Sequence, residues 1–171
     1  MLDRTMDKVD APSPSLPGEV LRYAYLQKPA MGSDLIRWAP QDQIAAAPIG
    51  LLYDAAKACD LRTLTNLVRK GLQPDGSAAP ALHHLIARSR EWMAVELLRA
   101  GLQVRGDDYE ALDTCLRGHA PEAAASLLER GMNLDGYLTW STERVEPLDN
   151  QAREILKELK AGRARRTVYS S

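Results

Sequence analysis

The sequence predicts an all-α protein: a short solenoid of about three stacked helix pairs, with a degenerate C-terminal cap and an irregular N-terminal extension. Three observations support this fold class. Glycine recurs every thirty residues, at Gly71, Gly101 and Gly131. Apolar residues recur at fixed distances before each glycine, and turn-forming residues follow it. A repeat of this length is typical of helix pairs that bury their apolar faces against one another.

The apolar residues before each glycine have the spacing of helices. Two adjacent apolar residues stand four and three positions before it, as Leu67-Val68, Leu97-Leu98 and Leu127-Leu128. A leucine stands nineteen positions before it in every copy, as Leu52, Leu82 and Leu112. Small or apolar pairs follow those leucines, as Ala55-Ala56, Leu85-Ile86 and Cys115-Leu116. We therefore expect two helices in each repeat, with these residues in the core.

The first repeat illustrates the boundaries of a unit. Residues 52–58 form one apolar stripe of about two helical turns. Asp60 is a good N-cap for the second helix, and Gly71 can adopt the positive φ that follows a helix C-terminus. Residues 73–81 contain proline, glycine and serine, which favour turns. Each unit is thus predicted as helix, tight turn, helix and extended finger.

This pattern resembles the ankyrin repeat, whose signature has Thr-Pro-Leu-His-x-Ala-Ala near the first helix and Leu-Leu-x-x-Gly-Ala-Asp after the second. Residues 80–83, Pro-Ala-Leu-His, come closest to the first motif, and residues 97–101 and 127–131 match the second. We interpret residues 50–162 as a divergent ankyrin-like domain. The arginine-rich composition without phenylalanine indicates a bacterial protein.

The sequence departs from the ankyrin signature in three ways. The repeat is shorter than the family's, Thr-Pro is absent from every copy, and Tyr53 and Asp113 replace the histidine in two copies. The resemblance implies a packing or hydrogen-bonding role for His83, which occupies the family's structural position. We expect His84, its neighbour, to face the concave side.

The first fifty residues do not fit the repeat, because Gln41 stands where a preceding glycine is expected. Residues 1–17 are rich in proline, serine and aspartate, and are predicted to be a disordered leader. Residues 18–49 are predicted to be a helical or irregular cap on the first repeat. A partner-binding segment or a secretion leader is the alternative for this region.

Two helices are predicted within this N-terminal cap. The first covers residues 19–28 and is stopped by Pro29. The second has Ser33 as its N-cap and ends at Trp38, before Pro40. The apolar residues expected to cover the first repeat are Val20, Leu21, Tyr23, Ala24 and Leu26.

The C-terminal end is predicted to close the stack with one more helix. That helix covers residues 147–160, with Asp149 or Asn150 as its N-cap. Gly162 follows the third repeat glycine by thirty-one residues and marks a degenerate fourth repeat. Residues 163–171 are predicted to be a frayed basic tail.

Chemistry-bearing residues are few. Cys115 and His119 have the spacing of a nucleophile pair on a helix. However, Cys115 aligns with Ala55, a small core position, which favours an inert buried thiol. The two cysteines and three histidines lack the spacing of a zinc site, and no phosphate-binding glycine loop is present. We expect no metal, no cofactor and no catalytic residue.

The resemblance implies that partners bind the concave face, which is built from the first helices and the fingers. The predicted contact residues are Lys57, His84, Arg88, Arg105, Tyr109, Thr114, Arg117, Tyr137 and Trp140. Arginine and aromatic side chains dominate binding hot spots. For Tyr109 and Trp140, packing between units is the alternative to binding.

These features predict a protein-interaction module whose partner is another protein. A bacterial effector is the first role considered, and an immunity protein or a secretion chaperone is the alternative. A nucleic-acid-binding regulator using Arg163, Arg165 and Arg166 is weaker, because the net charge is −1 and Tyr169 is the only aromatic residue beside these arginines. No apolar run is long enough to span a membrane and no standard signal peptide begins the chain. We expect a cytoplasmic protein, or one secreted into a host cell without a cleaved signal peptide.

Overall fold

The computed structural model describes residues 17–169, and side chains as far as residue 162. Within these residues the chain forms eleven helices and no strand, which confirms the predicted all-α class. The helices are α1 (Gly18–Gln27), α2 (Pro29–Trp38), α3 (Gln41–Ala45), α4 (Gly50–Lys57), α5 (Leu61–Arg69), α6 (Ala79–Ile86), α7 (Glu91–Arg99), α8 (Tyr109–Arg117), α9 (Pro121–Glu129), α10 (Leu134–Thr142) and α11 (Asn150–Tyr169). The leader predicted at residues 1–17 lies outside the described residues, except for Pro17.

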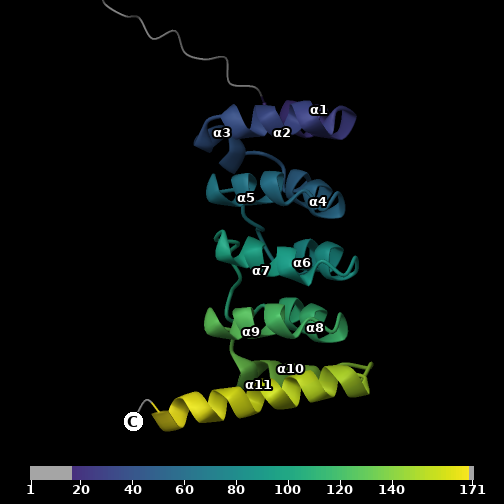
Figure 1. Ribbon diagram of the computed structural model, residues 1–171, viewed down its shortest axis with the longest axis vertical. Helices are drawn as coiled ribbons and strands as arrows, with labels where there is room; N and C mark the ends of the chain where they lie inside the picture. Colours follow the sequence, from purple (N-terminus) through teal and green to yellow (C-terminus); the bar gives the residue numbers. More distant parts are fainter. Residues whose placement is uncertain (1–16, 170–171) are drawn as a thin grey trace, which may run out of the picture.

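The helices form pairs that lie one above the other along the long axis of the molecule (Figure 1). Helix α4 packs with α5, α6 with α7, and α8 with α9. First helices contact first helices, α4 on α6 and α6 on α8. Second helices contact second helices, α5 on α7 and α7 on α9. The chain therefore builds two layers of helices, with one pair added per repeat.

The three repeat glycines end the second helix of each pair, as predicted. Their φ angles are +95° at Gly71, +111° at Gly101 and +97° at Gly131, a region in which a Cβ atom is unfavourable. The residue after each glycine donates a backbone hydrogen bond to the first residue of the apolar pair. These bonds join Leu72 N to Leu67 O (3.0 Å), Leu102 N to Leu97 O (3.2 Å) and Met132 N to Leu127 O (3.2 Å). They form the same helix ending in all three repeats.

The turn between the helices of each pair contains a second repeated conformation that the sequence did not predict. Cys59, Ser89 and His119 are thirty residues apart and have φ angles of +52°, +57° and +55°. The next residue in each copy donates its N–H to a carbonyl of the first helix, as in Arg90 N to Leu85 O at 2.9 Å. None of the three is glycine, so each turn carries some backbone strain.

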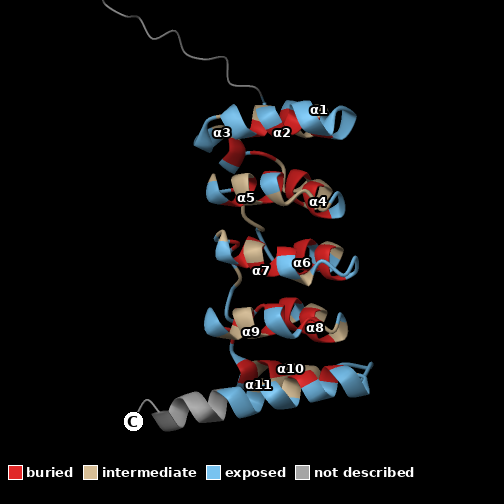
Figure 2. Ribbon diagram, viewed as in Figure 1, coloured by how far each residue is buried: buried red, intermediate tan, exposed pale blue. Residues whose placement is uncertain are grey.

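The core runs through the whole stack (Figure 2). The leucines at the start of the pattern and the small or apolar pairs that follow them are buried, as predicted. The apolar residues before each glycine are also buried, except for Leu128, which is half-buried. Asp60 is the N-cap of α5 and accepts a hydrogen bond from Thr63 N at 3.1 Å, as expected.

Side chains from one repeat also cap helices of its neighbour. Asp108 accepts hydrogen bonds from Ala111 N in its own helix and, at 2.7 Å, from Ala78 N at the start of α6. Glu91 on α7 accepts hydrogen bonds from Glu122 N at 2.7 Å and Ala123 N at 3.1 Å, at the start of α9. These contacts link residues about one repeat apart, so each repeat completes the backbone hydrogen bonding of another.

At the N-terminal end, α1 and α2 form a further pair that packs on α4 and α5. α1 ends before Pro29 and α2 ends at Trp38, as predicted, but the predicted start of α2 was wrong. Pro29 is itself the first residue of α2. Ser33 is therefore not an N-cap but lies buried inside α2, where its hydroxyl contacts that of Thr63 at 2.6 Å. Gly32, also buried in α2, lies directly against the backbone of Tyr25 in α1.

A lysine of the first repeat holds the end of α2. Lys70 Nζ donates hydrogen bonds to the carbonyls of Ile36 (3.0 Å), Arg37 (2.6 Å) and Ala39 (2.6 Å). The carbonyls of Ile36 and Arg37 lie in the last turn of α2 and that of Ala39 at its C-cap, where helix carbonyls lack intrahelical partners and a cation suits the negative end of the helix dipole. Burial lowers the pKa of the Lys70 ammonium group.

At the C-terminal end, α10 and α11 cover α8. The segment around residue 135, expected to be a finger, is helix α10, with Asn133 as its N-cap. Asp149 caps α11 by accepting a hydrogen bond from Ala152 N at 2.8 Å. It was one of the two residues predicted for this N-cap. Gly162 lies inside α11 and does not end a helix, so it is not a counterpart of the repeat glycines. The backbone of residues 163–169 continues this helix, which corrects the frayed tail predicted there.

Candidate functional site

The first helices carry a group of basic side chains on adjacent repeats. Lys57 lies exposed at the end of α4, and Arg88 lies exposed just after α6. Between them in the sequence, His84 is half-buried on α6. Burial lowers the pKa of His84, and the positive charges of Lys57, His83 and Arg88 act in the same direction. His84 is therefore neutral at pH 7, within a positive local field.

The acidic residue beside these basic side chains is Asp54 on α4, and it is already paired within the chain. Its negative charge raises the pKa of His84 and so opposes the lowering caused by burial and the nearby cations. Its carboxylate, however, accepts a hydrogen bond from Arg22 Nε of α1 at 2.8 Å and is largely buried. The Arg22–Asp54 ion pair cancels this charge, so that Lys57 and Arg88 dominate the exposed surface here. We call Lys57, His84 and Arg88 the basic cluster.

His83 is exposed, which corrects the packing role that the family resemblance implied for it. Its ring lies edge-on to that of His84, with 5.9 Å between the ring centroids. Two further predicted contact residues lie outside the basic cluster. Arg105 is exposed and pairs with Asp107 at 3.2 Å, and Thr114 is half-buried on α8.

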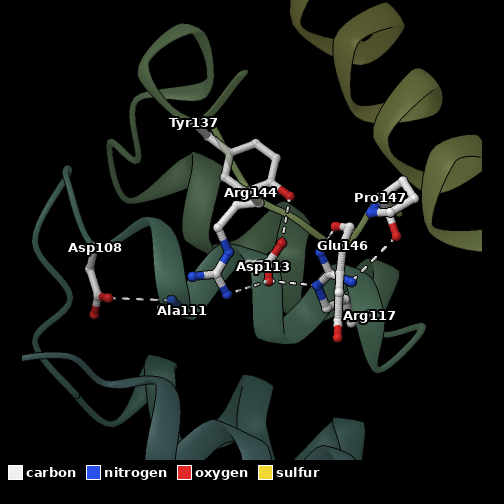
Figure 3. Close-up of polar contacts among 8 residues, drawn as sticks. All are labelled: Asp108, Ala111, Asp113, Arg117, Tyr137, Arg144, Glu146 and Pro147. Atoms are coloured by element: carbon white, nitrogen blue, oxygen red, sulfur yellow. Dashed lines mark hydrogen bonds and ion pairs between the residues drawn. The ribbon is translucent and has the colours of Figure 1, made fainter. Parts of the chain in front are cut away.

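Four predicted contact residues are used instead to close the C-terminal end of the stack. The first is Arg117, which is half-buried on α8 (Figure 3). Its Nε donates to Asp113 at 2.7 Å, and its other nitrogens donate to the carbonyls of Glu146 (2.7 Å) and Pro147 (3.5 Å). The guanidinium fork of Arg117 is thus engaged within the chain and ties α8 to the loop before α11.

Tyr137 was predicted to contact a partner, but the structure leaves it inaccessible to one. Its side chain is fully buried on α10, and its hydroxyl donates a hydrogen bond to Asp113 at 3.0 Å (Figure 3). Burial, followed by the nearby Asp113 charge, raises the pKa of Tyr137 well above its usual range. The hydroxyl therefore stays protonated and acts as a fixed donor.

Tyr109 and Trp140 pack together beside Tyr137, which supports the packing alternative considered for both. The Trp140 ring lies 6.0 Å from that of Tyr109 and 5.8 Å from that of Tyr137. The Arg144 guanidinium lies 4.6 Å from the Trp140 ring and 3.8 Å from the Asp113 carboxylate. These three aromatic residues join α8 to α10. Tyr109 and Trp140 are half-buried and only in part available to a partner, and Tyr137 is not available at all.

Asp113 is the centre of this arrangement. It is buried, and it occupies the position that the family resemblance gives to a histidine. Tyr137, Arg117 and Arg144 surround its carboxylate and come from three different segments of the chain (Figure 3). A buried carboxylate needs such partners, because leaving it unpaired is costly. We call these four residues the Asp113 cluster.

The possible nucleophile pair is not assembled. Cys115 is fully buried, and burial raises the pKa of its thiol well above the usual range. His119 instead faces α11, and its Nε2 lies 2.8 Å from the Asp149 carboxylate. Cys115 thus has the environment of a core residue, and His119 has that of a contact between repeats.

The described residues contain no group of three or more His, Cys, Asp or Glu side chains that could hold a metal ion. Among the same residues, no helix is both long and apolar enough to cross a membrane. The side chains of Arg163, Arg165 and Arg166, invoked for nucleic-acid binding, lie outside the described ones.

The sequence analysis did not predict that apolar residues at the N-terminal end would be exposed to solvent. Of the apolar residues expected to cover the first repeat, Leu21 is buried and Ala24 half-buried, whereas Val20, Tyr23 and Leu26 are exposed. Their spacing of three residues was the available signal, because it places them on one side of α1, away from Leu21.

No protein-family model matches the sequence, and comparisons with curated proteins and with solved structures found no match.

Proposed function

We propose that the chain is a divergent ankyrin-like solenoid that binds another protein, through a surface of its first helices centred on Lys57, His84 and Arg88. The observation that carries this proposal is the exposure of two cations from adjacent repeats around a half-buried histidine. Each first helix contacts the first helix of the next pair, which keeps such side chains at fixed positions along the stack.

The chemistry of the basic cluster favours an acidic partner segment. Arginine presents planar donors that match a carboxylate, and lysine adds a second positive charge. Asp54 contributes little opposing charge, because it is paired with Arg22. An acidic segment placed along α4 and α6 therefore meets complementary charge, which aids both association rate and specificity.

Such a surface serves a bacterial effector, an immunity protein or a secretion chaperone equally well. Each of these roles requires a fixed scaffold that recognises another protein. The identity of the partner decides among them, and capture by the intact chain followed by mass spectrometry is the direct route to it.

The test compares two double variants of the full chain. In Lys57→Glu/Arg88→Glu, both exposed cations of the basic cluster become anions. In the control, Arg69→Glu/Arg130→Glu, the same charge change is made at exposed positions at the ends of second helices α5 and α9. We expect the first variant to weaken partner binding by at least about tenfold and the control to leave it nearly unchanged.

The two double variants should unfold at similar urea concentrations, close to that of wild type, because all four positions are exposed and lie at or just after a helix C-terminus, so the small helix-dipole cost is matched. Equal loss of binding in the two variants would indicate a general charge effect. Full binding by the Lys57/Arg88 variant would exclude the basic cluster as the contact surface.

A further inference from the structure

His84 shares its surroundings with both cations of the basic cluster. Asp54, His84 and Thr114 stand thirty residues apart, at the same position of the first helices α4, α6 and α8. These helices contact one another in turn along the stack (Figure 1). Lys57 comes three residues after Asp54, and Arg88, in the turn after α6, comes four residues after His84. Side chains at these spacings are neighbours on a helical surface, so the half-buried ring of His84 lies beside a cation of its own repeat and one of the repeat before.

The charged groups around this ring leave it without an acidic partner. They come from α4, α6 and the turn after α6, and they are Lys57, Asp54, His83 and Arg88. At the corresponding position α8 carries the uncharged Thr114, and α7 belongs to the other layer of helices. Asp54, the acidic member of the set, is paired with Arg22 at 2.8 Å. No free carboxylate in the described part of the chain therefore pairs with His84.

We propose that His84 takes up a proton when an acidic segment binds the basic cluster, so that partner binding strengthens as the pH falls from about 7.5 to 6. The inference rests on the proposed function, because it concerns the same surface. An incoming carboxylate offsets the positive charge of Lys57 and Arg88 and offers the His84 ring an anionic partner. The proton comes from the solvent and binds a ring nitrogen. Since the complex then holds more protons than the separated molecules, acid favours its formation.

His83 provides an internal comparison. It has the same side chain and is the next residue in the sequence, with 5.9 Å between the two ring centroids. His83 is exposed, whereas His84 is half-buried. Water and salt screen the ring of His83 from nearby charges more strongly, so its protonation should depend less on whether a partner is bound. The two histidines therefore separate an effect of the His84 position from a general effect of pH.

The test uses the full chain and a defined acidic probe, a rhodamine-labelled ten-residue peptide of alternating glutamate and serine. Fluorescence anisotropy at low salt gives the dissociation constant at pH 7.5 and at pH 6.0, and glutamate is ionised at both. We expect wild type to bind the probe at least about threefold more tightly at pH 6.0. His84→Asn should bind it with nearly equal affinity at the two pH values, and the control His83→Asn should behave like wild type.

Calorimetry provides a second measurement that does not depend on a variant. The binding enthalpy of wild type at pH 6.5, measured in two buffers of different ionisation enthalpy, counts the protons taken up. We expect on the order of half a proton per complex. Both histidine variants should keep the helical circular dichroism spectrum of wild type, because neither side chain belongs to the buried core.

Wild-type binding without pH dependence or proton uptake would overturn the proposal, as would a pH dependence that persists in His84→Asn. An equal loss in the His83 and His84 variants would also overturn it. The double variant Lys57→Glu/Arg88→Glu distinguishes these results from failure of the proposed function. If the probe binds wild type and not the double variant, but independently of pH, only the inference about His84 fails. If the probe binds neither protein, or both equally, the proposed surface fails with it.

Discussion

The two ends of the stack finish the same repeat in opposite ways. At the C-terminal end, aromatic and charged residues turn inward, and α10 and α11 cover the last pair around the Asp113 cluster. At the N-terminal end, α1 and α2 bury Leu21, Tyr25 and Ile36 but leave Tyr23 and Trp38 exposed. The comparison shows that an aromatic residue on a repeat is not by itself a contact residue. Its role depends on whether a further helix follows on that side.

The largest effect should come from removing the centre of the C-terminal closure. Asp113→Ala leaves the Tyr137 hydroxyl and the Arg117 guanidinium without their shared acceptor, and should lower the free energy of unfolding by about 3 kcal/mol. Urea denaturation followed by circular dichroism measures this loss. Asp107→Ala, which removes an exposed partner of Arg105, should cost less than about 0.5 kcal/mol. Equal losses in the two variants would mean that the Asp113 cluster does not hold this end.

The N-terminal end should be most sensitive where its two helices cross. A Cβ atom at Gly32 would overlap the backbone of Tyr25, so Gly32→Ala must push α1 away from α2. We expect a loss of about 2 kcal/mol, as for overpacked cores. Hydrogen exchange should show faster exchange of the amides of α1 and α2 than of α8. The control Gly76→Ala adds a methyl group where no atom lies within 4 Å, and a similar loss there would contradict the crossing as the cause.

The turns of the interior repeats carry backbone strain. A substitution that relieves this strain should raise the free energy of unfolding, by less than the losses expected at the two ends. Ser89 is exposed and has a φ of +57°. Ser89→Gly should raise the free energy of unfolding by up to about 1 kcal/mol, because glycine adopts this conformation without steric cost. The reciprocal change, Gly101→Ala, should lower it by about 1 kcal/mol or more, although no atom obstructs the new methyl group. Thermal unfolding of each variant shows directly whether it is more or less stable than wild type.

The smallest effect concerns the pH dependence of the C-terminal end. The hydrogen bond from Ala152 N, and then that with His119, lower the pKa of Asp149 below its usual 3.8. A carboxylate with a lowered pKa contributes stability at pH values above 3.8, and loses it as the pH falls through the folded-state value. Asp149→Asn keeps an acceptor at the cap but cannot titrate. Its urea midpoint should therefore fall less than that of wild type between pH 5 and pH 3. Parallel profiles would mean that Asp149 has no part in the acid sensitivity.

Much of the interior could be predicted from the sequence, because each signal there is local. Positive φ at the repeat glycines and capping by Asp60 follow from the conformational preferences of single residues. The turn residues Cys59, Ser89 and His119 escaped prediction, since cysteine and serine do not favour a left-handed conformation and a single histidine is a weak signal of one. Regular spacing alone does not reveal backbone geometry when the side chains differ.

The ends were harder to predict for a physical reason. A proline that follows one helix can also start the next, so Pro29 was correctly predicted to end α1 but was not recognised as the start of α2, and Ser33 was wrongly predicted as its N-cap. The segment after Gly131 resembles the earlier fingers in sequence, yet it forms α10 and buries Tyr137. Whether Arg117 binds a partner or closes the stack depends on residues about thirty positions away. Such contacts leave no local pattern in the sequence.

The capping of helices by side chains of neighbouring repeats has a consequence for how the molecule opens. If the pair α6–α7 separated from α8–α9, Ala78 N would lose Asp108, and the start of α9 would lose Glu91. Partial unfolding would thus leave backbone N–H groups without acceptors in both pairs. This loss raises the free energy of intermediate states in which two neighbouring pairs have separated. The interior repeats should consequently melt in a single cooperative transition, and slow amide exchange there should report on global rather than local opening.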